Sequence, residues 1–578
     1  MAFPVMNGGL SRVQTEDNPR LILDAVVLGV CGGLSAQLFV WMLRLSSHFF
    51  LGTMAGFYPP GLPADGGVLR EAIGPHGLWL IPLVTTLGGL ISGLLVYKLA
   101  PETEGHGTDV VVKAVHWTGG TIRARVAPVK MIASALTIGS GGSAGREGPT
   151  ALISAGVGSV YAEWLHRSTR EKRLIVLMGM AAGLAAIFRS PIGTALFAVE
   201  VLYGGIEFEA EALLYCMLSS VVAYMVNGSF VGWKPLFVVP AQVAPTTVAE
   251  YGWFALLGIA SGVVATALPE IFYRIRDGFL ALRVPPWIKP AIGGLGLGAM
   301  ALALPEVLGG GYGWIQEAIN GQLALKLLVA LLAAKIAGMA LTVSSGGSGG
   351  VFAPSLFTGA MLGGAFAAAA HQPAAGLVVV GMCSVFGGAA RVPVATLLMV
   401  AEMTGGYQLL VPACLAVTLS FLVQMRLSKF VKYGSLYEGQ VVGRIDSPAH
   451  RAEHVALALQ ILNSDNVALP PQLSHLHLAA LLQSGVALDL PDQEQLTAGA
   501  LRPDSRWVGK SIADCALDKS APGARILAIL RGTTVITPHA QTILQPGDRL
   551  LILASKEAQA KFNEHLASPS AALQKSDA

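Results

Sequence analysis

The sequence between Leu21 and Val423 is a succession of apolar segments, and this feature constrains the fold more than any other. The segments Leu21 to Leu51 and Leu78 to Leu99 are each long enough to cross a lipid bilayer as a helix. Only 13% of all residues are charged, whereas a typical soluble domain has about 25%. Most of the chain is therefore expected to lie in lipid, where helices satisfy their own backbone hydrogen bonds.

The stretch from Ser140 to Thr150 places one carboxylate, Glu147, among glycines at the head of an apolar segment. An acid at that depth is energetically costly and indicates a functional site by default. The glycines let the backbone turn and expose its N–H groups, and a helix that begins at Pro149 directs its positive end to the same place. Such a backbone attracts anions. We therefore predict an anion pathway that contains Glu147; the alternative is an acid that only caps its helix.

The membrane part repeats one order of features in two halves, about 21–235 and 250–440. In each half, an apolar segment with a lysine precedes a Gly/Ser-rich loop and a helix started by proline. A second proline-started helix, which ends in an acid, follows. Short, interrupted apolar segments at matching places indicate a midplane site in an inverted-repeat transporter. The matching residues are Lys130 and Lys335, Pro149 and Pro354, and Glu200 and Glu402.

The ends of the chain differ from its middle in composition. Residues 1–20 form a polar segment, 21–440 the membrane domain, 441–500 a predicted helical linker, 501–566 a small α/β (α+β) domain and 567–578 a flexible tail. Basic runs after apolar segments favour the cytoplasmic side, so we expect a multi-pass protein with both termini in the cytoplasm. The five cysteines are scattered without metal-ligand spacing. No nucleophile–base pair or nucleotide-binding loop is present, so neither enzymatic activity nor a cofactor is expected.

Several motifs resemble signature elements of the CLC chloride channels and proton-coupled chloride transporters. They are Gly145-Arg-Glu-Gly-Pro149, Gly349-Gly-Val-Phe-Ala-Pro354 and the late Tyr437. Gly105-His-Gly-Thr-Asp109 stands where that family usually has Gly-Ser-Gly-Ile-Pro. The resemblance covers roughly Leu21 to Gln440. It implies an all-α polytopic membrane protein, a CLC-type inverted repeat with broken helices, and a homodimer in which each subunit has its own pore.

The resemblance also implies residue roles. Glu147 would be the gate, which occupies an anion site when ionised and leaves it when protonated. Val351 and Phe352 would offer backbone N–H groups to the anion, and Tyr437 its hydroxyl. The full set of anion-binding residues implied is His106, Gly107, Arg146, Gly148, Val351, Phe352 and Tyr437.

His106 is the main departure from the family pattern, because it takes the place of the inner pore serine. It either lines the pore as a donor, or is a buried histidine satisfied by a carbonyl or by Asp109 or Glu104. The departure leaves anion selectivity open: chloride is the family default, and nitrate and fluoride are alternatives. Lys130 is interpreted as an electrostatic attractor in the pathway, the alternative being a snorkelling contact. Arg146 is interpreted as an ion-pair partner.

Val201 is informative through what it lacks. Counted from Pro191, it falls where the family's proton exchangers carry the second of two consecutive acids, the intracellular proton relay. Valine cannot carry a proton. The sequence therefore favours passive conduction, with a proton/chloride antiporter that uses another proton route as the alternative.

The C-terminal part resembles the RCK-C domain, the C-terminal subdomain of potassium-conductance regulators. Val508–Ile512, Ile529–Gly532 and Leu544–Ile552 carry this resemblance, and 524–531 and 549–554 are strand-like. Such domains often bind small ligands and dimerise. We expect a chloride channel of a bacterial inner membrane, gated by protonation of Glu147, with voltage as a further candidate input, and modulated by its tail. The expected partners are chloride, protons, lipid, a second subunit and a small ligand of the tail, but not nucleic acid.

Overall fold

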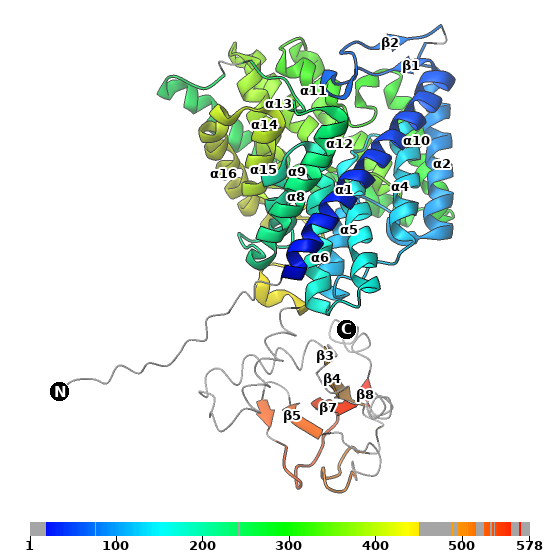
Figure 1. The fold of residues 1–578 in the computed structure, drawn as a ribbon, viewed down its shortest axis with the longest axis vertical. Helices are drawn as coiled ribbons and strands as arrows, with labels where there is room; N and C mark the ends of the chain where they lie inside the picture. Colours follow the sequence, from blue (N-terminus) through cyan, green and yellow to red (C-terminus); the bar gives the residue numbers. More distant parts are fainter. Residues whose placement is uncertain are drawn as a thin grey trace, which may run out of the picture. The chain divides into compact units, whose positions relative to one another are not determined.

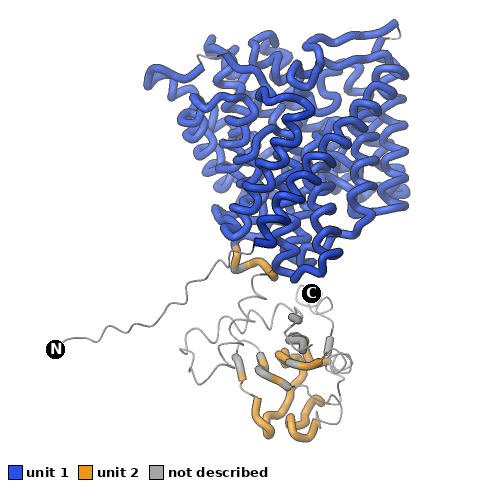
Figure 2. Tube along the Cα trace, in the orientation of Figure 1, with its two compact units in different colours: residues 1–443 blue, residues 444–578 orange. Residues whose placement is uncertain are grey.

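The computed structural model of the chain describes residues 19–75, 77–240, 243–449, 488–489, 494–502, 505, 507–515, 525–531, 534–536, 538–555 and 566–567. The chain divides into two compact units, residues 1–443 and 444–578 (Figure 2). The predicted segments 1–20 and 567–578 lie almost wholly outside the described residues. The first unit is helical, and the second contains a small β-sheet.

The helices of the first unit form one bundle, in which helices of the first half lie beside those of the second (Figure 1). Those of the first half are α1 (Pro19–Ser47), α2 (Ile81–Leu99), α3 (Thr108–Trp117), α4 (Val126–Gly139), α5 (Glu147–Trp164), α6 (Thr169–Phe188), α7 (Pro191–Glu200) and α8 (Ala210–Val231). Those of the second half are α9 (Val248–Ala281), α10 (Lys289–Ala301), α11 (Tyr312–Ile319), α12 (Leu325–Met339), α13 (Phe352–Ala370), α14 (Ala374–Ala390), α15 (Pro393–Thr404) and α16 (Leu410–Leu427). Two short strands, β1 (Phe57–Tyr58) and β2 (Ala72–Ile73), pair in the loop after α1.

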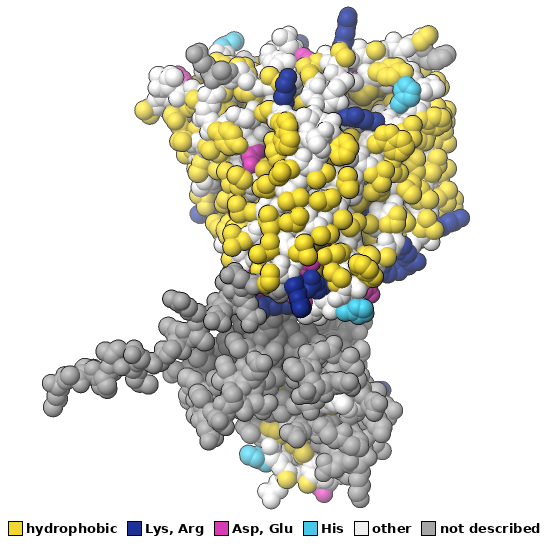
Figure 3. All heavy atoms as spheres, in the orientation of Figure 1, with side chains coloured by type: hydrophobic (Ala, Val, Ile, Leu, Met, Phe, Trp, Pro, Cys, Tyr) yellow, Lys and Arg dark blue, Asp and Glu magenta, His cyan; other side chains and the backbone are white. Residues whose placement is uncertain are grey.

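Within the described residues, seven helical segments are long and apolar enough to cross a membrane. Other apolar helices, such as α4 and α7, are too short for this, which is the broken-helix pattern that the sequence predicts. Figure 3 shows hydrophobic side chains over most of the visible face of this unit, with Lys and Arg mainly toward its two ends. The predicted architecture of the first unit, a mostly helical protein with several membrane spans, is confirmed.

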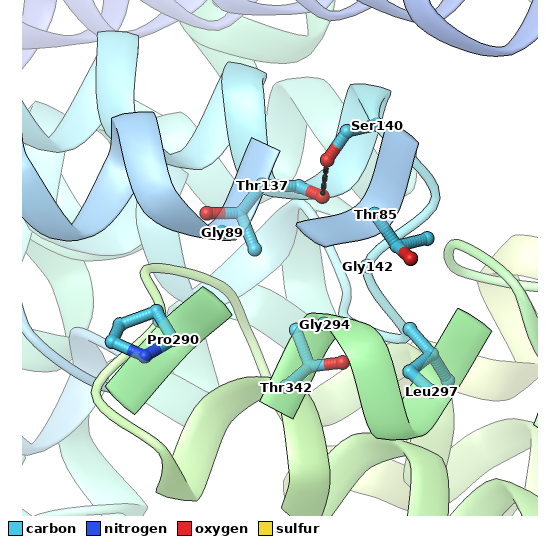
Figure 4. A pocket seen from close by; sticks show the side chains of 10 residues that line it. Thr85, Gly89, Thr137, Ser140, Gly142, Pro290, Gly294, Leu297 and Thr342 are labelled. Atoms are coloured by element: carbon cyan, nitrogen blue, oxygen red, sulfur yellow. Dashed lines mark hydrogen bonds between the residues drawn. The ribbon is translucent and has the colours of Figure 1, made fainter. Parts of the chain in front are cut away.

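Matching residues of the two halves face each other where α2 packs against α10. A cavity of about 10 Å³ there is lined in pairs by Thr137 and Thr342, Gly142 and Gly347, and Gly89 and Gly294 (Figure 4). The glycines permit this approach: a Cβ on Gly89 would lie 2.3 Å from the carbonyl oxygen of Pro290, and one on Gly294 would lie 2.3 Å from that of Thr85. The repeat read from the sequence is thus a physical correspondence between the halves.

Two glutamates, the buried Glu200 and the half-buried Glu402, cap helices of the opposite half. Glu200, at the end of α7, accepts hydrogen bonds from the backbone N–H groups of Val394 (3.1 Å) and Ala395 (2.7 Å) at the start of α15. Glu402, near the end of α15, accepts one from the N–H group of Gly193 (2.8 Å) at the start of α7. Carboxylates are stabilising at helix N-termini. The geometry is that of structural acids tying the two halves together.

Replacing Glu200 or Glu402 with alanine is expected to lower the free energy of unfolding by roughly 2–3 kcal/mol, because helix N–H groups lose a charged acceptor. The exposed Glu163 of α5 provides the control, and its alanine variant should stay within about 0.5 kcal/mol of wild type. Unfolding in detergent solution measures both. Losses no larger than that of the Glu163 variant would contradict the capping role.

The second unit contains an antiparallel sheet of order β3-β4-β7-β5-β6, with β8 paired to β4. The strands are β3 (Leu488–Asp489), β4 (Glu494–Leu501), β5 (Arg525–Arg531), β6 (Thr534–Ile536), β7 (Arg549–Ser555) and β8 (Leu566–Ala567). β5 and β7 correspond to the strand-like segments of the sequence. The predicted helical linker 441–500 lies largely outside the described residues, but its end is wrong: 494–500 belong to β4, because pairing with β7 in the sheet outweighs local helix preference.

Candidate functional site

Three glycine-rich breaks meet at one place in the helical unit. Gly145 and Gly350 exchange two backbone hydrogen bonds, of 2.8 and 2.7 Å, in an antiparallel bridge. The break before α3 joins them, because Gly105 donates to the carbonyl of Gly347 (3.1 Å) and accepts from the N–H group of Gly349 (3.2 Å). The helices α3, α5 and α13 begin from these loops. Their positive N-terminal ends therefore gather around one small region.

Glu147 is the first residue of α5 and is fully buried. The hydroxyl of Tyr312 donates a hydrogen bond to its Oε1 atom. The backbone N–H groups of Arg146 and Ala353 lie close to its carboxylate, but its Oε2 atom has no hydrogen-bond partner in the described residues. A Cβ on Gly145 would lie 2.1 Å from Oε2, so only glycine leaves room for this side chain. A negative group thus occupies a pocket of N–H donors that would equally suit an anion.

His106 lies just before the start of α3 and is 7% exposed. Its Nδ1 atom has no hydrogen-bond partner in the described part of the chain. The nearby acid Asp109 instead accepts from the N–H group of Gly439 (2.8 Å) and pairs with Lys113 (3.1 Å). The ring of His106 lies 5.4 Å from that of Tyr437, centroid to centroid. Nδ1 is therefore not satisfied by Asp109, and the pore-lining role of His106 stays a prediction.

Aromatic side chains surround the start of α13. The ring of Phe352 lies 3.9 Å from that of Phe386 and 5.8 Å from that of Phe197. Phe197 in turn lies 6.3 Å from Tyr437, which is buried. Val351, the N-cap of α13, has its backbone at the paired loops. The rings of Phe352 and Tyr437, two of the predicted contributors, are therefore linked through Phe197 of the first half.

Gly107 and Gly148 bring the breaks before α3 and α5 into backbone contact. A Cβ on Gly148 would lie 2.1 Å from the carbonyl oxygen of His106, and one on Gly107 would lie 2.8 Å from that of Gly148. Gly107 also has φ = +88°, a conformation that side chains disfavour. These glycines serve close packing next to Glu147, and anion binding by them stays a prediction.

Lys130 is buried, and its Nζ atom donates to the carbonyl oxygens of Thr103 (3.0 Å) and Gly105 (2.6 Å). Lys335, its counterpart, makes the matching contact with Gly309 (2.7 Å). Each lysine thus fixes the turn that precedes a short helix, α3 or α11. The structure gives Lys130 a positioning role, and its role as an electrostatic attractor stays a prediction.

Arg146 takes part in an ion-pair cluster beside the site. Its guanidinium pairs with the carboxylate of Asp65 (3.1 Å) and lies over the ring of Tyr312, 5.1 Å from its centroid. Arg189 pairs with the same carboxylate (2.8 Å), and Arg44 donates to the backbone carbonyl of Asp65 (2.9 Å). Arg146 is thus an ion-pair partner, as interpreted from the sequence, and the acid it pairs with is Asp65, in a loop far away in the sequence.

Asp65 lies in the loop between α1 and α2, outside the spanning helices. Burial acts to raise the pKa of its carboxyl, but the guanidinium groups of Arg146 and Arg189 outweigh this and hold the pKa below its usual value. The stabilisation it contributes is therefore present at neutral pH and lost only as the pH falls through that lowered pKa. A cavity of about 290 Å³ borders this cluster and is also lined by Arg44 and Tyr312.

Sequence reasoning missed Asp65 and Tyr312. Each carried a weak local signal: Asp65 lies in a Pro-Ala-Asp-Gly turn, and Tyr312 follows the glycine-rich break Gly309–Gly311. Nothing local says which residue they contact.

Val201 is buried directly after α7 and brings no titratable group there. Other buried titratable side chains lie near the residues that follow Val201. The hydroxyl of Tyr203 donates to Glu209 (2.7 Å), and Nε2 of His116 lies 2.9 Å from the carbonyl oxygen of Leu202. The sequence did not single out Glu209 or His116 as groups of interest.

Comparison with protein families gives two matches. The family described as voltage gated chloride channel matches residues 88–425. The TrkA-C domain, also called RCK-C, matches residues 500–567.

Individual relatives carry both kinds of transport name. A protein named voltage-gated ClC-type chloride channel ClcB, from Escherichia coli O157:H7, is 28% identical over 421 residues, 71% of this chain and 97% of the relative. One named H(+)/Cl(-) exchange transporter ClcA, from Salmonella agona, is 31% identical over 366 residues, 60% of this chain and 77% of the relative.

The fold has a counterpart among solved structures. The crystal structure of a CLC-type fluoride/proton antiporter has a TM-score of 0.61 at 24% sequence identity and covers 73% of this chain and 98% of its own. With the family match over more than half of the sequence, the chain belongs to the CLC family of voltage-gated chloride channels and transporters, and a TrkA-C domain follows its membrane part.

Proposed function

We propose that the protein conducts anions, with chloride as the main one, through a pathway that Glu147 closes. The observation that carries this proposal is the buried Glu147 carboxylate among the N–H donors of the joined breaks. An ionised side chain there competes with an anion for the same positive helix ends. Protonation removes that competition, so conduction rises as the pH falls.

Passive conduction is supported by Val201, which stands where exchangers of the family carry a proton relay. A side chain without a titratable group cannot link Glu147 to intracellular protons. Glu200, next to it, is engaged in capping α15. In this proposal Glu147 exchanges protons with one side only and acts as a gate.

Proton-coupled exchange is the second candidate. The observation that favours it is a group of buried titratable side chains near Val201. Tyr203, two residues after Val201, donates a hydrogen bond to Glu209, and His116 lies against the carbonyl oxygen of Leu202. Such groups could carry protons by another route. The relative named ClcA is described as an exchanger.

We place the protein in a bacterial inner membrane as a homodimer with cytoplasmic termini, with voltage as a further input and the TrkA-C domain as a modulator that takes a small ligand. His106, with its free Nδ1 in the described structure, is the residue that sets the preference among chloride, nitrate and fluoride.

Liposome flux separates the two candidates. Purified protein is reconstituted with a chloride gradient, and chloride efflux and internal pH are followed together, with protein-free liposomes as the control. We expect chloride efflux once a potassium ionophore shunts the voltage, and no proton movement against its own gradient. Uphill proton movement driven by chloride would reject passive conduction in favour of exchange, and loss of that movement in Glu209→Gln would identify the route.

A further inference from the structure

We propose that Tyr312 is a positioning residue of the gate: its hydroxyl holds ionised Glu147 in the closed position, so that the pathway has a tyrosine at its outer end as well as Tyr437 at its inner end. This inference rests on the proposed function of Glu147. It assigns a role to a residue of the second half that none of the CLC signature motifs contains.

The direct contact is the hydrogen bond from the Tyr312 hydroxyl to Oε1 of Glu147. An O–H donor stabilises a carboxylate in its ionised form more than in its protonated form. Hydrogen bonds to charged groups are among the stronger ones in proteins. While this bond is made, leaving the site requires Glu147 to break it, so Tyr312 favours the closed state.

The ring of Tyr312 is held from several sides, which fixes where its hydroxyl points. The Arg146 guanidinium lies over it, 5.1 Å from its centroid, and the ring of Phe237 lies 6.0 Å away. Gly311 precedes it with φ = +76°, a turn that only glycine makes easily. Lys335 fixes the carbonyl of Gly309 at the start of that turn. The hydroxyl is thus pre-positioned and does not have to be ordered when the gate closes.

The repeat places Tyr312 at a helix start that matches the start of α3. Lys130 holds the turn at Gly105 before α3, and Lys335 holds the turn at Gly309 before α11. Counting on from these glycines, Gly310 corresponds to His106 and Tyr312 to Thr108. On the α3 side, the Tyr437 ring lies against His106. In an inverted repeat the starts of α3 and α11 face opposite sides of the membrane. One tyrosine therefore lies toward each side of the pathway.

Tyr312 also borders the space from which an external anion would arrive. It lines the cavity of about 290 Å³ together with Arg44, Asp65 and Arg146. The cationic groups of that cavity attract anions. An anion that accepts the hydroxyl's hydrogen bond takes it away from Glu147, which couples anion arrival to release of the gate. The charged or titratable side chains that face Glu147 are Arg146 from its own loop, Tyr312 of α11 and Tyr437 from the segment after α16.

The test is Tyr312→Phe, which removes the hydroxyl and keeps the ring under Arg146. Chloride efflux from liposomes is measured between pH 4 and pH 9 for the wild type and the variant. We expect efflux at neutral pH to rise about tenfold, and the midpoint of acid activation to move up by about one pH unit, the change that corresponds to a hydrogen bond to a charged group. Tyr161→Phe is the matched control, because its hydroxyl also bonds a carboxylate, Asp24 (2.8 Å), at the far end of α5.

A second background shows whether Tyr312 acts through Glu147. In Glu147→Ala the acceptor is gone, and we expect Tyr312→Phe to add nothing there. An unchanged pH profile in the wild-type background would overturn the inference, as would an equal change in both backgrounds, which would make Tyr312 part of the pore wall. If wild type and Glu147→Ala both fail to conduct, the proposed function is rejected and the role of Tyr312 with it. Monodisperse elution in detergent shows that each variant is folded.

Discussion

Glu147→Gln is expected to raise chloride efflux at neutral pH by at least about tenfold and to remove most of its dependence on pH. Glutamine has the shape of the protonated acid and carries no charge at any pH. The ionised carboxylate competes with anions for the N–H groups of Arg146 and Ala353, whereas a neutral amide competes weakly. A difference of about 1.4 kcal/mol in this competition already gives a factor of ten.

The control for this variant lies on the same helix. Glu163→Gln, at an exposed position of α5, should leave both the efflux rate and its pH profile unchanged. Efflux is measured in liposomes between pH 4 and pH 9, as for the Tyr312 variant. A variant at Glu147 that kept the full pH dependence would contradict the gate, and would assign that dependence to His106, which Glu147→Gln combined with His106→Ser would test.

The part of the site that the sequence predicts is the part built from local chemistry. The glycine-rich loops around Glu147 and Val351 need glycine for their turns. The helices after them carry proline in their first turn, although α5 begins at Glu147, two residues before the predicted start at Pro149. The buried acid is conspicuous because the surrounding sequence is apolar. The family and the fold class follow from these features, and both are confirmed.

The parts that the sequence could not predict depend on contacts between distant segments. Tyr312 meets Glu147 across 165 residues, and Arg146 meets Asp65 across 81. Neither tyrosine nor aspartate in a loop says by itself what it will touch. The strand β4 is a similar case. It covers the last residues of the predicted helical linker, and these form a strand by pairing with β7. Tertiary contacts decide such positions, and local preference does not encode them.

Lys130 shows how a correct observation can support two mechanisms. A buried cation beside an anion pathway suggests attraction of the anion. Yet its Nζ atom, which has three protons, donates two hydrogen bonds to the carbonyls of Thr103 and Gly105. Lys335 makes the same kind of contact in the other half. A shared structural role explains both lysines, whereas attraction would have to be argued separately for each.

Lys130→Met and Lys335→Met are therefore expected to destabilise the protein by similar amounts, about 3–5 kcal/mol, since each leaves two buried carbonyls without a charged donor. Unfolding in detergent measures this, with Lys98→Met at an exposed position of α2 as the control. The flux changes should have opposite signs. Lys130→Met loosens the turn that carries His106 and lowers chloride efflux. Lys335→Met loosens the turn that carries Tyr312 and raises efflux at neutral pH.

These two lysine variants also separate positioning from attraction. If Lys130 served only to attract anions, Lys130→Met would lower efflux while its stability stayed at that of Lys98→Met, and higher salt would reduce the difference from wild type by screening the charge. If it positions the turn, stability falls and salt has little influence, because the lost hydrogen bonds are buried. The inverted repeat then has a simple logic: one buried lysine in each half fixes one short helix, and each helix places a different side chain at its own end of the pathway.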